Sequence, residues 1–382
     1  MQYFTHLSRL SLSLSAVVLL CSCGGAGTTE PTEMGDSPAT IERDEAQAAS
    51  SESSLGDVAE EFVTPESATS VLAPYFVGDG IKEQTVGPIE PNTWRDLMTT
   101  DGVLLSVVDL GEAPRRLLRL SPEVGQVETL EFEMAMTMGM SMGGEGLVMM
   151  DTPNVSFTIE SELLAMDTGE GLSLRWTYTG VDVAEGIGLM AGQEELMEAE
   201  MRGLVGLSGL QTMNSLGYPL SSSMSLTDDL SPMMREQMRS VEGMLDSAAF
   251  VLPGQAVGAG ASWETLRELE NNGFSFLVHQ VVNLIELTDT QAKFEVETTQ
   301  ALGDSAPNIP NLPVGAEVEV TSLVSDGTGE ITLFEGMMNS KLVQSDLAMS
   351  IEMQVSGLGP EPMEMALQNQ TGLKVTAEVV AE

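Results

Sequence analysis

The sequence predicts a mainly β protein, in which antiparallel meanders form a curved sheet or half-open barrel with one or two packed helices. Three observations support this fold class. Long segments after residue 125 alternate polar and apolar residues with a period of two, the pattern of a half-buried strand. Short turns containing Gly or Asp join several of these segments. Helical spacing of apolar residues is found in two segments, 193–207 and 231–245.

The first 22 residues predict an export signal peptide. A weakly basic start precedes the apolar run Leu10–Leu20, which is too short to span a membrane. The run ends in LCSCG, which resembles the lipobox of bacterial lipoprotein precursors, with Leu20 and Ser22 placed before Cys23. The resemblance implies cleavage before Cys23 and acylation of its sulfur and amine, which together give lasting membrane attachment. Gly24, in place of Asp, implies sorting to an outer membrane; an ordinary secretory signal with incidental cysteines is the alternative.

Two segments separate the lipid from the main fold. Residues 23–72 are rich in Ser, Thr, Ala, Glu and Pro and hold few large apolar residues, which predicts an acidic, disordered tether. Its expected role is reach between the lipid and the folded part. Residues 73–120 form a mixed lead-in segment, in which Gly and Pro residues interrupt the apolar runs and a short strand is expected at 103–110.

The remaining chain predicts two meanders, a first with helices over 121–250 and a second over 251–382. A Met-Asn-Ser step lies between strand-like runs in both, at 213–215 and at 338–340. This recurrence indicates an internal duplication, although chance similarity between β sequences of low aromatic content is an equal alternative. The expected strands are 126–142, the hairpin 154–166 with 172–183, the hairpin 273–287 with 292–302, and then 316–338, 341–357 and 373–380.

The two helical segments differ in their signals. In 193–207, Leu196, Met197, Met201, Leu204 and Val205 fall on one side and glutamates lie elsewhere. The segment 231–245 begins with a Ser-Pro step, which suits an N-cap followed by the first helical position, and apolar residues then follow at helical spacing. We expect both helices to lie against the concave side of the sheet.

The segment LPGQAVGAGASWE (252–264) resembles a turn signature of bacterial lipoproteins and secreted proteins to which no activity is attached. A Leu-Pro step, a Val-Gly-x-Gly-Ala step and a Trp introduce a long strand there. The matching residues are Leu252, Pro253, Val257, Gly258, Gly260, Ala261 and Trp263. The resemblance implies a β fold over residues 115–382 and lends no catalytic residue.

The composition excludes several kinds of site. Cleavage would remove Cys21 and lipidation would consume Cys23, so no cysteine is left for a disulfide, a thiolate metal site or a nucleophile. His279 is the one histidine of the mature chain, and its alternating strand favours a satisfied core histidine over a catalytic base. A formal charge of −43 repels nucleic acid. We therefore expect no enzyme, no cofactor and no nucleic-acid partner.

A row of five methionines is the main candidate for function. Met134, Met136, Met138, Met140 and Met142 alternate with small residues, which puts all five on one strand face. The flexible Met side chain adapts to irregular apolar space, so we expect this strand face to line either a packed core or a ligand cavity. The alternatives are a hydrophobic partner surface and Cu(I) binding, because Cu(I) accepts thioether ligands. No metal site is assigned.

Three arginines stand out in so acidic a chain, namely Arg115, Arg116 and Arg119. One interpretation is a solvated strand with local ion pairs to Glu112 and Glu123, and the other is contact with lipid phosphates or an anionic partner.

The sequence thus favours a membrane-anchored, extracytoplasmic, non-catalytic lipoprotein that binds a lipid or another hydrophobic ligand in a Met-lined apolar cavity. The first alternative is a structural or interaction lipoprotein of the envelope that has no cavity and binds envelope proteins through its surface. Cu(I) binding is the weaker alternative.

Overall fold

The fold is known from a computed structural model. It describes residues 75–76, 81–84, 89, 102–142, 147–166, 171–184, 194–224, 250–271, 274–303, 315–339, 342–357 and 362–380. The expected signal peptide, the expected tether with Cys23 and the expected helix 231–245 lie outside these residues.

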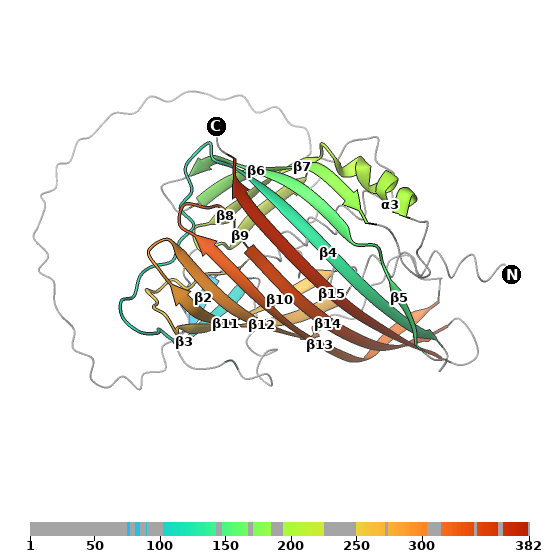
Figure 1. The fold of residues 1–382 in the computed structure, drawn as a ribbon. Coiled ribbons are helices and arrows are strands. Elements are labelled where there is room, and N and C mark those ends of the chain that lie inside the picture. The colour runs from blue at the N-terminus through green and yellow to red at the C-terminus, as the bar shows by residue number, and fades with distance from the viewer. Residues whose placement is uncertain are drawn as a thin grey trace, which may run out of the picture. The chain divides into compact units, whose positions relative to one another are not determined.

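One sheet of 15 strands contains all the described strands (Figure 1). It is open, because its order begins at β1 and ends at β9, and neighbours pair antiparallel except for β2 and β3. The mainly β fold class is therefore confirmed. The strands are β1 (Tyr75–Phe76), β2 (Ile81–Gln84), β3 (Val103–Asp109), β4 (Val127–Met142), β5 (Val148–Asp151), β6 (Val155–Met166), β7 (Gly171–Val183), β8 (Ser208–Asn214), β9 (Pro219–Met224), β10 (Ser262–Asn271), β11 (Phe274–Leu287), β12 (Gln291–Leu302), β13 (Glu317–Phe334), β14 (Leu342–Ser356) and β15 (Met363–Val379).

The sheet order shows how the two halves of the chain join. It runs β1-β2-β3-β10-β11-β12-β13-β14-β15-β4-β6-β7-β8-β9, and β5 pairs with part of β4. The meander β10–β15 is therefore inserted between β3 and β4, and its last strand pairs with β4 over the whole methionine row. In Figure 1, β4 lies between β15 and β6.

The helix expected at 193–207 is confirmed in a shorter form. The α-helix α3 spans Glu194–Met201 and the 3-10 helix η3 spans Arg202–Leu204. Met201 and Leu204 pack against Trp176 and Tyr178 of β7, so this end of the helix lies on the apolar face of the sheet. Val205 follows η3 in extended backbone and is exposed, contrary to the helical pattern.

Register divides the long strands into an apolar face and an exposed face. The apolar face carries alternate residues such as Trp263, Val282, Leu347, Leu367 and Met136, all of which are buried. Along the strands this face has three zones: a densely packed end, a polar belt in the middle, and a Met-rich end. Each zone is defined below by its residues.

The densely packed end is built around Trp263 and Phe294, whose rings lie 5.7 Å apart at a steep angle. Leu216, in the turn after β8, packs into the same cluster. The backbone N–H of Leu252 donates to the carbonyl of Leu216 at 2.9 Å. The sheet therefore bends until the β8–β9 turn reaches the apolar side of β10.

The LPGQAVGAGASWE segment closes this end through buried residues and close backbone contacts. Val257, Ala261 and Trp263 are completely buried, and the indole N–H of Trp263 donates to the carbonyl of Val251 at 3.1 Å. A Cβ on Gly258 would lie 1.7 Å from the carbonyl oxygen of Glu112, so only glycine fits there. In this protein the segment contributes to the packing of the core.

Candidate functional site

The methionine row lies on the apolar face of β4, as the alternation predicts. Met134, Met136, Met138 and Met140 are opposite Leu373, Thr371, Asn369 and Leu367 of β15, and Met142 is in register with Met365. Met136 is buried, while Met134, Met138 and Met140 are half-buried. The side chain of Met142 lies outside the described part of the structure.

The Met-rich end combines this row with residues of five other strands. Met138 and Met140 pack against a cluster that also contains Met349, Met353 and Met365. The cluster is apolar throughout but incompletely covered, because six of its members are only partly buried. These members are Met138, Met140, Val318, Val320, Leu323 and Met365.

The polar belt crosses the apolar face between the two ends. Arg267, Gln300, Ser325 and Asn369 occupy one row of the register, with Val278 and Met349 at the intervening strands, and all four polar residues are buried. The side-chain amide of Asn369 donates to the hydroxyl of Thr371 at 3.0 Å. Polar side chains in such a position are not needed for packing and cost free energy unless they are hydrogen-bonded.

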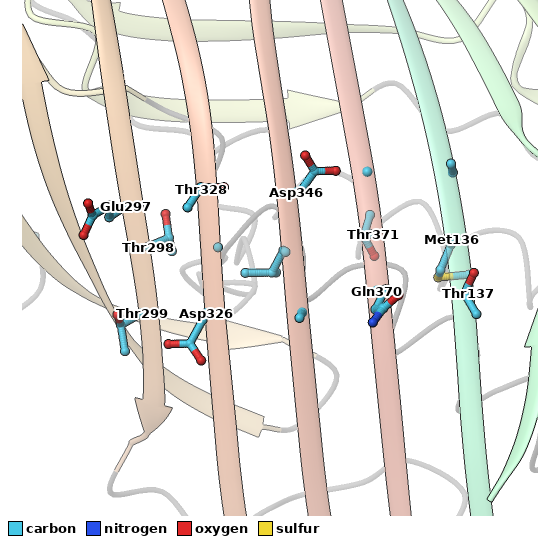
Figure 2. Close-up of a pocket in the computed structure, with 15 residues that line it drawn as sticks. Met136, Thr137, Glu297, Thr298, Thr299, Asp326, Thr328, Asp346, Gln370 and Thr371 are labelled. Carbon is cyan, nitrogen blue, oxygen red and sulfur yellow. The ribbon is translucent and has the colours of Figure 1, made fainter. Parts of the chain in front are cut away.

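A trough of about 570 Å³ lies elsewhere, on the exposed face (Figure 2). It crosses β12, β13, β14, β15 and β4 between two rows of exposed side chains, and its floor is the row that contains Thr298, Leu347 and Met136. Since Leu347 and Met136 are buried toward the other face, they contribute mainly backbone to the trough. Its carboxylates, Glu297, Asp326 and Asp346, belong to no metal-binding group in the part of the chain that the structure describes.

The three arginines of the lead-in segment bind backbone carbonyls. Arg115 donates twice to the carbonyl of Gly111, at 2.9 and 2.6 Å, and Arg116 donates to that of Asp289 at 2.7 Å. Arg119 donates to the carbonyls of Pro253 and Gly254 at 3.1 and 3.2 Å. Arg119 thus attaches the segment to the loop before β10, and Arg116 attaches it to the β11–β12 turn. Neither interpretation from the sequence foresaw these contacts.

His279 is buried on the face of β11 opposite to the apolar face. Its Nε2 lies 2.9 Å from Oε2 of Glu264, which also accepts the backbone N–H of Ile89 at 2.6 Å. Ile89 packs with Leu266 and Leu277 over this part of the sheet. The pair therefore holds a segment of the lead-in against β10 and β11.

Glu128 is a buried carboxylate that the sequence argument missed. Its oxygens accept the backbone N–H groups of Met338 at 2.7 Å and Asn339 at 3.1 Å, and the side-chain amides of Asn339 and Gln126 at 2.9 and 2.7 Å. The alternation of β4 does contain a signal, because Glu128 has the same parity as Leu130 and the methionines. It therefore had to face the apolar side.

Within the described ranges, no helix is long and apolar enough to cross a membrane. Comparison with known proteins adds little. No protein-family model matches the sequence, and a search of curated proteins finds no match. Among solved structures, an outer membrane channel from Pseudomonas putida F1 is similar over 67% of this chain and 97% of that chain, with 9% identity and a TM-score of 0.19. A similarity this weak supports neither a fold assignment nor a function.

Proposed function

We propose that this protein is a non-catalytic, lipid-anchored lipoprotein of the bacterial cell envelope that binds a lipid or similar hydrophobe on the Met-rich end of its apolar face. The observation that carries the proposal is the incomplete burial of that end. Six of the 13 residues of the Met-rich cluster are half-buried, Met138, Met140 and Met365 among them, whereas 16 of the 22 residues of the cluster around Trp263 are buried. Flexible thioether side chains suit a surface that repacks around a ligand.

The other half of the proposal concerns the anchor. The lipobox-like LCSCG predicts acylation at Cys23, and the acidic segment 23–72 then separates the sheet from the lipid. A carrier placed in this way would meet hydrophobic ligands close to the membrane.

The experiment is native mass spectrometry of the mature lipoprotein, purified from membranes in a mild neutral detergent. We expect a species heavier than the acylated chain by the mass of a lipid, which is lost on collisional activation. Met140→Asp should remove this species, because a carboxylate desolvated by the ligand is costly. Met149→Asp is the matched control, since Met149 is exposed on β5. A wild-type protein that always appears without added mass contradicts the proposal and favours a structural lipoprotein that binds envelope proteins through its surface.

Cu(I) binding is a second candidate, favoured by one observation. The Met-rich end gathers five methionines, Met138, Met140, Met349, Met353 and Met365, and Cu(I) accepts thioether ligands. The same instrument separates the two candidates. A mass increase of one copper ion per chain after addition of Cu(I) would show that the site binds copper. If no such increase is seen, the Cu(I) candidate is rejected and hydrophobe binding remains the proposed function.

A further inference from the structure

Three half-buried methionines form one patch at the Met-rich end. Met138 and Met140 follow one another on the apolar face of β4 and belong to one cluster with Met365 of β15. Met365 is in register with Met142, which makes it the diagonal neighbour of Met140. Diagonal neighbours on one face of a sheet lie about 7–8 Å apart, within reach of long side chains. The three thioethers therefore cover one area of the sheet, which we call the thioether patch.

The thioether patch is the accessible part of the methionines in this cluster. Met138, Met140 and Met365 are half-buried, whereas Met349 and Met353 of the same cluster are buried. A dissolved oxidant reacts only with a thioether that it can reach. Oxidation should therefore divide the methionines of the cluster into a reactive patch and a protected interior.

Oxidation changes the chemical character of such a patch. A peroxide transfers one oxygen atom to the sulfur of methionine: the O–O bond breaks, an S–O bond forms, the sulfur loses two electrons, and the peroxide is reduced to water or an alcohol. The product, methionine sulfoxide, is polar, and sulfoxide reductases return it to the thioether with electrons from a dithiol. A hydrophobe that covers a sulfoxide removes water from it, and this desolvation costs free energy.

We infer that the thioether patch is a reversible oxidation switch, in which peroxide converts Met138, Met140 and Met365 to sulfoxides and thereby weakens binding of the hydrophobe. This inference rests on the proposed function and names the regulation of the same site. Methionine suits the role better than leucine or valine, because those side chains supply the same apolar contact but hold no sulfur to oxidise.

The sheet should survive this oxidation. Met136, Met349 and Met353 are buried, so they are shielded from a dissolved oxidant and keep the packed part of the face apolar. Asn369 is directly opposite Met138 in the register, so a sulfoxide at Met138 gains an amide as its cross-strand neighbour. The oxidised state is therefore a folded protein with a polar patch.

The test measures binding of monoolein before and after oxidation. This single-chain lipid is uncharged, which avoids the repulsion of anions by a chain with a formal charge of −43. The full protein, purified from membranes in neutral detergent, is treated with hydrogen peroxide and titrated with monoolein by native mass spectrometry. We expect the affinity to fall about tenfold or more, with an unchanged far-ultraviolet circular dichroism spectrum. Sulfoxide reductases with dithiothreitol should restore it.

Leucine variants assign the response to the thioether patch. The variant that combines Met138→Leu, Met140→Leu and Met365→Leu keeps the apolar volume, and its affinity should no longer respond to peroxide. The comparison is made within each variant, before and after peroxide, whatever its starting affinity. The matched control combines Met149→Leu with Met166→Leu, because both methionines are exposed and lie outside the cluster. The control should respond as the wild type does.

A second measurement needs no variant and decides the question if the triple leucine variant does not fold. Bound monoolein should slow the oxidation of Met138, Met140 and Met365, and it should leave the rate at exposed Met149 unchanged. Mass spectrometry of peptides follows each rate separately. Equal rates with and without bound monoolein overturn the inference.

The outcomes separate this inference from the proposed function. Equal affinities of the reduced and the oxidised protein overturn the switch and leave the hydrophobe site in place. A peroxide response that persists in the triple leucine variant also overturns it, and so does a loss of binding that accompanies unfolding. A reduced protein that binds no monoolein contradicts the proposed function itself.

Discussion

The carboxylate of Glu128 accepts a hydrogen bond of 2.7 Å from the backbone N–H of Met338, 210 residues later in the chain. Glu128 is the second residue of β4, and Met338 lies in the turn between β13 and β14. Because Glu128 is completely buried, these hydrogen bonds replace its hydration shell. The contact fixes the start of the methionine strand against the inserted meander.

Glu128→Ala should lower the free energy of unfolding by about 3 kcal/mol, because several buried donors lose their charged acceptor. Glu131→Ala, on the exposed face of the same strand, should change it by less than about 0.5 kcal/mol. Urea unfolding followed by circular dichroism measures both. Equal effects would show that the carboxylate is not a fixed part of the fold.

The glycines of the signature segment should differ in their tolerance of alanine. Gly258→Ala places a Cβ against the backbone carbonyl of Glu112, which cannot move cheaply, and we expect a loss of about 3 kcal/mol. Gly260→Ala has open space and suffers only from its φ of +78°, at a cost of about 1 kcal/mol. Thermal unfolding of the two variants checks this order, and the reverse order would contradict the close approach.

Met136 distinguishes the core part of the methionine row from the remainder. Met136→Ala should destabilise the protein by about 2 kcal/mol or more, because Met136 is buried. Met149→Ala, at an exposed position, should have almost no effect. Half-buried Met140→Ala should fall between them in urea unfolding. A Met136 variant as stable as wild type would mean that this part of the row faces open space.

Tyr178 predicts a loss of stability at alkaline pH. Burial raises the pKa of Tyr178 well above its ordinary value of 10.0. The unfolded chain therefore loses this proton above about pH 10, while the folded chain keeps it. The contribution of Tyr178 to the free energy of unfolding is thus fully present below pH 10 and declines as the pH rises. Tyr178→Phe should make the free energy of unfolding decline less between pH 10 and 12. An unchanged slope in urea titrations would contradict this account.

Much of the fold follows from local alternation. The period-two pattern predicts β4, the β6–β7 and β11–β12 hairpins and the common face of the methionines, because a strand face is a local property. It misses the first ten residues of β15, where MEMALQNQTG contains Gly, Asn and Gln of low strand propensity. The pairing of this strand with β4 supplies the stability that the local sequence lacks.

The candidate site needs information that alternation does not hold. The parity of WETLREL shows that Arg267 shares a face with Trp263 and Leu269. Its alignment with Ser325 and Asn369, however, depends on the order and register of six strands. That register includes irregular steps at Leu284–Glu286 and Val320–Ser322, whose positions no short-range pattern specifies.

Photo-methionine labelling tests the central claim most directly, because it reports what the methionines touch in the intact protein. Cells grow with this diazirine analogue, membranes are irradiated, and adducts on tryptic peptides are located by mass spectrometry. The account predicts adducts of lipid mass at Met138 or Met140 and none at exposed Met149. Adducts that join Met138 and Met140 only to the protein's own side chains would contradict it, because the Met-rich end would then be a closed core.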